Sequence, residues 1–230
     1  MLRENLQKVK DRIEKACVKA GRNIDEVTLI AVSKTKPLSD IEELILCGTK
    51  EFGENKVQEL VDKYENVSTP VNWHLIGHLQ TNKVKYIVDK VSLIHSVDSL
   101  KLAKEIQKEA AKKNVIVNIL VQVNVANEDT KFGLDTSEVL HLVNEISILP
   151  NIRIKGLMTI APYVENPEDN RPYFKELKQL LLDIKSKNID NVDMSILSMG
   201  MTNDYEVAIE EGATMVRVGT GIFGERNYNI

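Results

Sequence analysis

The chain alternates short apolar stretches with longer segments of helical period along almost its whole length. Most of the short stretches are rich in β-branched residues and carry apolar residues at consecutive positions, which is typical of strands buried on both faces. Such strands pair in parallel, and helices cover the sheet that they form. The predicted strands cover residues 27–33, 51–53, 73–77, 93–97, 115–125, 154–160, 195–199 and 215–223.

Eight strand–helix units favour closure of the sheet into a (β/α)8 barrel. The predicted helices between the strands cover residues 39–47, 56–64, 83–89, 100–112, 137–149, 173–184 and 205–211. An extra amphipathic helix is expected before the first strand, because Leu2, Leu6, Val9, Ile13 and Cys17 fall at helical spacing. The 230 residues suit one barrel domain over residues 1–230, with no second domain. A doubly wound open sheet is the alternative.

Charge and hydropathy restrict the function and the location. The formal net charge of −4 argues against binding to nucleic acid, because such domains usually carry a basic face. The first residues carry charge throughout and lack the apolar core of a signal peptide. No stretch is long and apolar enough to cross a membrane, so we expect a cytoplasmic protein.

Lys34 closes the first predicted strand, in the segment Ala31-Val32-Ser33-Lys34. Functional groups of a (β/α)8 barrel lie at the carboxyl ends of its strands, so this amine is expected at the barrel mouth. Partial burial there would lower the pKa of the amine and favour formation of a Schiff base. The alternative is a lysine that leaves the strand for water, as most lysines do.

The last two predicted strands end in small and hydroxylated residues. Strand seven ends with Ser198, Met199, Gly200 and Met201, and strand eight contains Gly219, Thr220 and Gly221. Barrels often bind phosphate between the loops after these two strands. Glycine lets backbone N–H groups approach an anion, and serine and threonine hydroxyls donate to its oxygens. The sequence favours a phosphate site here over two simple tight turns.

Arg217 and Asn55 are two further candidates for the mouth. Arg217 interrupts the apolar segment Met215-Val216-Arg217-Val218, and a buried guanidinium needs a partner. That partner is either a carboxylate of the barrel, such as Glu54 or Asp98, or a bound ligand. Asn55 follows strand two, where it either hydrogen-bonds a ligand or caps the next helix.

His74 and His78 lie four residues apart, a spacing that suits a metal site only on a helix. Residues 73–77 have the pattern of a strand, in which residues four apart lie much farther from each other. No metal site is predicted.

Several motifs together resemble one family, the pyridoxal phosphate homeostasis proteins, which are relatives of the barrel domain of alanine racemase. The resemblance covers essentially the whole chain. The matching segments are Ala-Val-Ser-Lys-Thr-Lys-Pro at 31–37, Phe-Gly-Glu-Asn at 52–55, Trp-His-Leu-Ile-Gly-His-Leu-Gln at 73–80, Gly-Leu-Met at 156–158, Ser-Met-Gly-Met at 198–201 and Val-Arg-Val-Gly-Thr at 216–220.

The resemblance implies a barrel that binds pyridoxal 5′-phosphate (PLP) and helps to balance its level in the cell, without enzymatic turnover. It places the cofactor imine on Lys34 and the pyridine nitrogen opposite Arg217. It places the phosphate site around Ser198, Met199, Gly219 and Thr220. The implied partners are PLP and the apo-forms of PLP-dependent enzymes, and a chain without a second domain is expected to be a monomer.

Two other functions remain open at this stage. A PLP-dependent amino-acid racemase needs a second base opposite the lysine, which alanine racemases take from an added C-terminal domain. A lysine-imine aldolase without PLP would be colourless. We also hypothesise that Lys36 or Lys131, the latter in the loop after strand five, assists imine exchange; simple solvation is the alternative for both.

Overall fold

The computed structural model describes residues 1–126, 128 and 132–225, and its eight strands form a closed parallel barrel in chain order. Strand β8 pairs with β1, with Thr28 opposite Met215, and this pairing closes the barrel. The predicted (β/α)8 barrel is confirmed, and the open-sheet alternative is wrong. The strands are β1 Thr28–Val32, β2 Glu51–Glu54, β3 Asn72–Leu75, β4 Leu93–Val97, β5 Val117–Gln122, β6 Ile152–Met158, β7 Val192–Met201 and β8 Met215–Val218.

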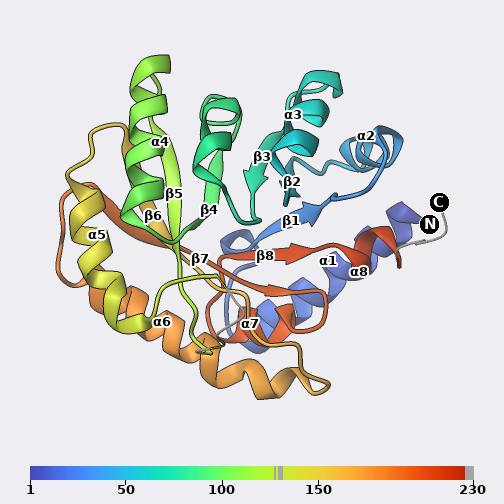
Figure 1. Cartoon of the computed structure of the whole chain (residues 1–230). Helices are drawn as coiled ribbons and strands as arrows, with labels where there is room; N and C mark the ends of the chain where they lie inside the picture. The colour runs from blue at the N-terminus through green and yellow to red at the C-terminus, as the bar shows by residue number, and fades with distance from the viewer. Residues whose placement is uncertain (127, 129–131, 226–230) are drawn as a thin grey trace.

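Helices form an outer layer around the barrel (Figure 1). The α-helices are α1 Leu2–Lys19, α2 Leu38–Leu46, α3 Val57–Asn66, α4 Leu100–Lys113, α5 Val139–Ser147, α6 Arg171–Lys185, α7 Tyr205–Glu210 and α8 Thr220–Phe223. Short 3-10 helices are η1 Ile24–Glu26, η2 Thr81–Tyr86, η3 Thr136–Glu138 and η4 Pro167–Asn170. The extra helix before the first strand is α1, which packs on α7 and α8 through buried residues that include Leu6, Val9 and Ile13.

Two apolar layers stabilise the barrel. The larger one lies between the strands and the helices and includes Ile94, Leu197 and Val216. A small cluster of Leu93, Leu120 and Met158 lies on the other face of the strands, inside the barrel. Successive residues of a strand point to opposite faces, so each strand contributes to both layers. This alternation decides which side chains can reach the barrel interior and its mouth.

The eighth predicted strand, residues 215–223, is too long. Strand β8 ends at Val218, and Thr220–Phe223 forms the short helix α8. The N–H groups of Ile222 and Phe223 donate to the carbonyl oxygen of Gly219, which starts the helical turn. Ile222 and Phe223 are nevertheless buried, so their apolar character looked like a continuing strand.

The predicted helix over residues 83–89 is also different in the structure, where Thr81–Tyr86 forms the 3-10 helix η2.

Both cysteines are free thiols, with Cys17 buried and Cys47 partly buried. None of the helices in the described ranges is long and apolar enough to span a bilayer.

Candidate functional site

A cavity of about 560 Å³ lies at the carboxyl ends of the strands. Its lining comes from the ends of β1, β2, β3, β6, β7 and β8 and from the segments that follow them, as expected for the mouth of a (β/α)8 barrel. The lining residues are Val32, Lys34, Asn55, Ile76, Ile160, Tyr163, Met201, Thr202, Asn203, Arg217, Gly219 and Thr220.

Five of the seven residues predicted for the site line this cavity, namely Lys34, Asn55, Arg217, Gly219 and Thr220. The other two do not reach it. Ser198 is fully buried inside the barrel, where its hydroxyl binds Arg217. Met199 points to the opposite face of β7 and belongs to the apolar layer between strands and helices.

Lys34 follows β1 in a turn that a buried ionic cluster holds in place. The ammonium group of Lys63, on α3, donates to the backbone oxygen of Ser33 at 2.7 Å. The same group pairs with Glu54 at 2.8 Å and with Glu59 at 2.7 Å. The side chain of Lys63 is 5% exposed and that of Glu54 is completely buried, so these charges have little access to water. The cluster thereby fixes the backbone immediately before Lys34.

Two further contacts define the other side of that turn. Thr35 has a positive φ of 64°, and its backbone N–H donates to the carboxylate of Glu59. The hydroxyl of Ser33 donates to Glu54 at 2.6 Å. Burial raises the pKa of Glu54, although the neighbouring Lys63 and Ser33 act in the opposite direction. The sequence motif pointed to Lys34 but gave no signal for Lys63, because a lysine in an amphipathic helix is usually solvated.

Arg217 is held by neutral oxygen atoms. Its guanidinium donates to the hydroxyl of Ser198 and, at 2.7 Å, to the backbone oxygen of Thr159. The carboxylates that the sequence suggested as partners are elsewhere: Glu54 pairs with Lys63, and Asp98 lies 4.0 Å from His78. Arg217 is 3% exposed, and burial lowers its pKa to about 10. The group therefore stays protonated near neutral pH, with its charge next to the cavity.

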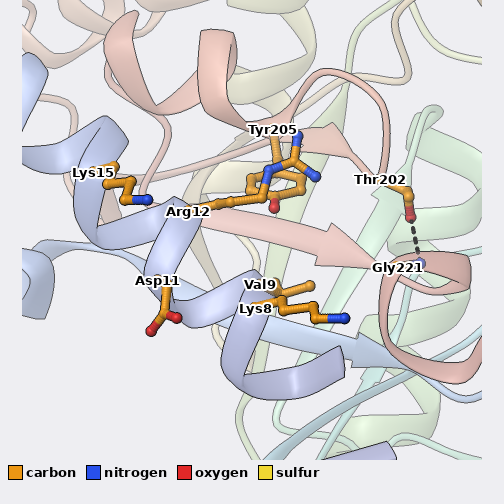
Figure 2. Close-up of a pocket in the computed structure, with 8 residues that line it drawn as sticks. All are labelled: Lys8, Val9, Asp11, Arg12, Lys15, Thr202, Tyr205 and Gly221. Atoms are coloured by element: carbon orange, nitrogen blue, oxygen red, sulfur yellow. Dashed lines mark hydrogen bonds between the residues drawn. The ribbon is translucent and has the colours of Figure 1, made fainter. Parts of the chain in front are cut away.

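The β8–α8 junction supplies the predicted phosphate-binding turn. Gly219 precedes α8 and Thr220 is its first residue, and both line the cavity. The N–H of the next residue, Gly221, donates to the hydroxyl of Thr202 at 3.4 Å, and Figure 2 marks this hydrogen bond with a dashed line. This contact joins the turn after β8 to the turn after β7, which are the two loops that bind phosphate in many barrels.

A second hollow of about 360 Å³ lies between α1 and the β7–α7 region, lined by Lys8, Arg12, Lys15, Tyr205 and other residues that Figure 2 labels. Helix residues supply most of its lining, and only Thr202 comes from the segment directly after a strand. Arg12 is already paired with Glu206 and lies over the ring of Tyr205. This groove is therefore a weaker candidate than the barrel mouth.

Sequence reasoning missed several lining residues. Ile76 and Ile160 stand at or next to the ends of predicted strands, so the strand-end rule would have found them. Tyr163 lies in the irregular segment that follows strand six, and the strand-end rule also places this segment at the mouth. Of the two lysines proposed for imine exchange, Lys36 donates to the backbone oxygen of Phe223 at 3.2 Å, and Lys131 lies outside the described residues.

The paired histidines of the sequence have separate surroundings. His74 contacts His95 and Glu51 inside the barrel. His78 stacks on Phe132 with ring centres 3.9 Å apart. The two imidazoles thus do not face a common point, as the strand spacing predicted.

Comparison with known proteins gives a consistent assignment. The family model described as alanine racemase, N-terminal domain, matches residues 2–227. The pyridoxal phosphate homeostasis protein of Aquifex aeolicus is 50% identical over 226 residues, with 98% of each chain covered. The structure of PipY from Synechococcus elongatus with PLP bound is 31% identical, with a TM-score of 0.85 and coverage of 97% of this chain and 100% of that one.

A more distant structure, alanine racemase from Corynebacterium glutamicum, is 12% identical with a TM-score of 0.71 and shares the fold. The match covers 96% of this chain but only 61% of the racemase chain. The chain belongs to the alanine racemase N-terminal-domain family and, within it, to the pyridoxal phosphate homeostasis proteins.

Proposed function

We propose that this protein binds PLP at the barrel mouth as an imine on Lys34 and helps to balance the supply of the cofactor, without catalytic turnover of its own. The observation that carries the proposal is the arrangement around one cavity of Lys34, Arg217 and the Gly219–Thr220 turn. The names of the relatives and the PLP bound to PipY support it.

The residues of the cavity fit the chemistry of PLP. A cavity of about 560 Å³ is within the usual range for small-molecule and cofactor sites. The amine of Lys34 matches the aldehyde, and the turn at Gly219 and Thr220 suits the phosphate. The side-chain oxygen of Asn55 is buried and has no hydrogen-bond partner among the described residues, so a donor such as the ring hydroxyl of the cofactor would satisfy it.

Bound PLP supplies an aldehyde carbon that accepts amines and a pyridine ring that withdraws electrons. Lys34 would mask that aldehyde reversibly and release it to another amine. Arg217 would donate to the pyridine nitrogen, and because its guanidinium stays protonated near neutral pH it would discourage protonation of that nitrogen. Ile76, buried beside Asn55, and Ile160 would limit the access of water.

A spectroscopic titration tests the proposal. Purified protein with PLP is expected to develop a visible imine band, and Lys34→Ala should abolish it. Lys36→Ala is the matched control: Lys36 lies two residues away and does not line the cavity, so this variant should keep the band. A band of normal intensity in Lys34→Ala would contradict the proposed attachment.

The second candidate is a PLP-dependent amino-acid racemase. Tyr163 favours it, since this phenol lines the cavity together with Lys34. However, Tyr163 is 89% exposed, and an exposed phenol is poorly held for proton transfer on the far face of a cofactor. A chirality assay with amino-acid substrates decides: turnover that is lost in Tyr163→Phe would replace the proposed function by racemisation.

The remaining alternative function is a lysine-imine aldolase that works without PLP. It predicts that protein treated with PLP shows no imine band, whereas a sugar-derived aldehyde forms an imine that borohydride traps.

Delivery of the cofactor is measured separately, as the rate at which loaded protein activates an acceptor apo-enzyme. We expect a slower rate in Lys131→Ala if this residue assists imine exchange; an unchanged rate removes Lys131 from that role.

A further inference from the structure

Five polar side chains form a continuous row through the inside of the barrel. We call them the interior row: Glu51 on β2, His74 on β3, His95 on β4, Ser198 on β7 and Arg217 on β8. Glu51 contacts His74 at 2.8 Å, and His74 contacts His95 at 2.9 Å. His95 contacts Ser198 at 2.9 Å, and Ser198 contacts Arg217. The row leads from the start of β2 to the cavity at the mouth.

The row is shielded from water over most of its length. His95 and Ser198 are completely buried, and His74 and Arg217 are 2% and 3% exposed. Only the side chain of Glu51, at 26%, has substantial contact with solvent. Hydrogen bonds between buried polar groups are retained in a single arrangement, because each unsatisfied group is costly.

The donors and acceptors in the row allow only one direction of hydrogen-bond donation, from Arg217 towards Glu51. A guanidinium only donates, so the oxygen of Ser198 accepts from Arg217. The hydroxyl proton of Ser198 then goes to Nδ1 of His95. An imidazole whose Nδ1 accepts carries its proton on Nε2, and His95 therefore donates to Nδ1 of His74. His74 in turn donates from Nε2 to the carboxylate of Glu51.

The opposite direction fails at both ends. If His95 donated to Ser198, the hydroxyl proton of Ser198 would have no partner among the contacts of the described residues. Nε2 of His74 would face the carboxylate of Glu51 either without a proton or as part of an imidazolium. The forward direction satisfies every group with neutral imidazoles. It also agrees with the pKa of His95, which burial and the charge of Arg217 hold well below its ordinary value.

We propose that Glu51, His74, His95 and Ser198 are positioning residues, which act as a one-way hydrogen-bonded row to hold Arg217 at the mouth. Through this row, a carboxylate at the start of β2 fixes the orientation of a hydroxyl at the far end. Ser198 offers Arg217 only its oxygen, and the other fixed acceptor is a backbone carbonyl. Two of the five N–H groups thus donate to neutral acceptors. The carboxylate of Asp204 acts on the charge of Arg217 without a hydrogen bond to it among the contacts of the described residues, so N–H groups remain for a ligand in the cavity.

The first test needs no cofactor. Long-range ¹H–¹⁵N correlation spectra of the histidine side chains distinguish the two neutral tautomers and the imidazolium. The chain has 4 histidines, so His→Gln variants of the exposed His78 and His141 complete the assignment. We expect both His74 and His95 as the neutral Nε2–H tautomer at pH 7.5. A proton on Nδ1 of His95, or an imidazolium at either position, overturns the proposed direction.

The second test rests on the proposed function, because it measures PLP binding. His95→Phe removes the acceptor of the Ser198 proton and frees that hydroxyl to rotate, so we expect the dissociation constant for PLP to rise about tenfold. The absorbance maximum of the bound cofactor should also shift. Ser96→Ala is the control: this serine is the next residue on β4, is equally buried, and its hydroxyl has no hydrogen-bond partner in the part of the chain that the structure describes.

The outcomes of the two tests are separable. Unchanged PLP affinity and absorbance in His95→Phe would overturn the positioning role even if the tautomers are as expected. Failure of the unmodified protein to bind PLP would contradict the proposed function, while the tautomers would still decide the direction of the row. Should His95→Phe not fold, Ser198→Ala removes the hydroxyl that accepts from Arg217 and is expected to weaken PLP binding to a similar degree.

Discussion

Lys63 shows how a single buried residue supports the site without touching the cavity. Its ammonium group joins Ser33, Glu54 and Glu59, and its side chain is 5% exposed. Replacement by methionine keeps the length of the side chain but leaves Glu54 buried without its cation. We expect Lys63→Met to lower the free energy of unfolding by about 3–5 kcal/mol, measured by urea titration.

Lys56, at the start of the same helix, provides the control for Lys63. It is exposed, so Lys56→Met should change the free energy of unfolding by less than about 0.5 kcal/mol. Equal stability of Lys63→Met and the unmodified protein would show that the cluster does not stabilise the turn before Lys34.

His95 gives the stability of the protein a defined dependence on pH. Complete burial, together with His74 and Arg217, holds its folded-state pKa well below the ordinary value of 6.5. Below pH 6.5 the unfolded chain therefore binds a proton at His95 that the folded protein does not bind. As the pH is lowered through this range, His95 alone should reduce the free energy of unfolding by about 1.4 kcal/mol for each pH unit. The loss ends when the pH reaches the folded-state pKa.

Urea titrations of the unmodified protein and His95→Phe from pH 7.5 downward measure this contribution. The variant should be less stable at pH 7.5 but should lose stability less steeply below pH 6.5. Identical slopes for the two proteins would mean that His95 is not kept neutral by the fold.

At the scale of elements, Gly77 sets how closely the segment after β3 approaches the segment after β2. A methyl group at position 77 would come within 2.4 Å of the backbone oxygen of Asn55. Gly77→Ala must therefore displace Asn55, which lines the cavity. We expect a dissociation constant for PLP raised by about tenfold, since the proposed hydrogen bond between Asn55 and the cofactor would be lost. Binding is measured by the visible absorbance.

Gly21 is the matched control for Gly77. It also lies in a loop, and a methyl group there would meet no atom within 4 Å, although its φ of +65° makes alanine mildly strained. Gly21→Ala should lower the free energy of unfolding by about 1 kcal/mol and leave PLP binding unchanged. Unchanged PLP binding in a folded Gly77→Ala would remove Asn55 from the proposed site.

The sequence predicts the order of the elements well because strands buried on both faces have an unambiguous pattern. The prediction fails where the same sequence pattern can arise from two different structures. Ile222 and Phe223 are buried like strand residues but belong to helix α8. Ser198 and Met199 were grouped by their position at a strand end, although adjacent residues of a strand point to opposite faces. On β7, this alternation places Ser198 in the interior row and Met199 in the outer apolar layer.

Contacts between distant strands cannot be predicted in this way. His95 and Ser198 are 103 residues apart and meet only because the barrel closes. The same holds for the carboxylate partners suggested for Arg217, since the sequence gives no distance across the barrel. The sequence could predict that Lys34 and the Gly219–Thr220 turn line one cavity, because all strands of a barrel end on the same side, whatever the sequence between them.

For the whole molecule, we expect one barrel domain that acts as a monomer. Large apolar side chains with substantial exposure come from separate elements, such as Val18 on α1, Leu46 on α2 and Ile148 after α5. Single exposed residues of this kind are normal for a protein surface. Light scattering coupled to size-exclusion chromatography should give a mass near 26.0 kDa. A mass twice as large would show that a surface of the barrel pairs two copies.

The attachment of PLP to Lys34 is the central claim, and borohydride reduction followed by peptide mapping tests it most directly. Reduction converts an imine into a stable secondary amine, so the lysine that held the cofactor keeps a pyridoxyl group. We expect one modified peptide, with the pyridoxyl group on Lys34. A pyridoxyl group on another lysine, or modification spread over exposed lysines with none on Lys34, would contradict it.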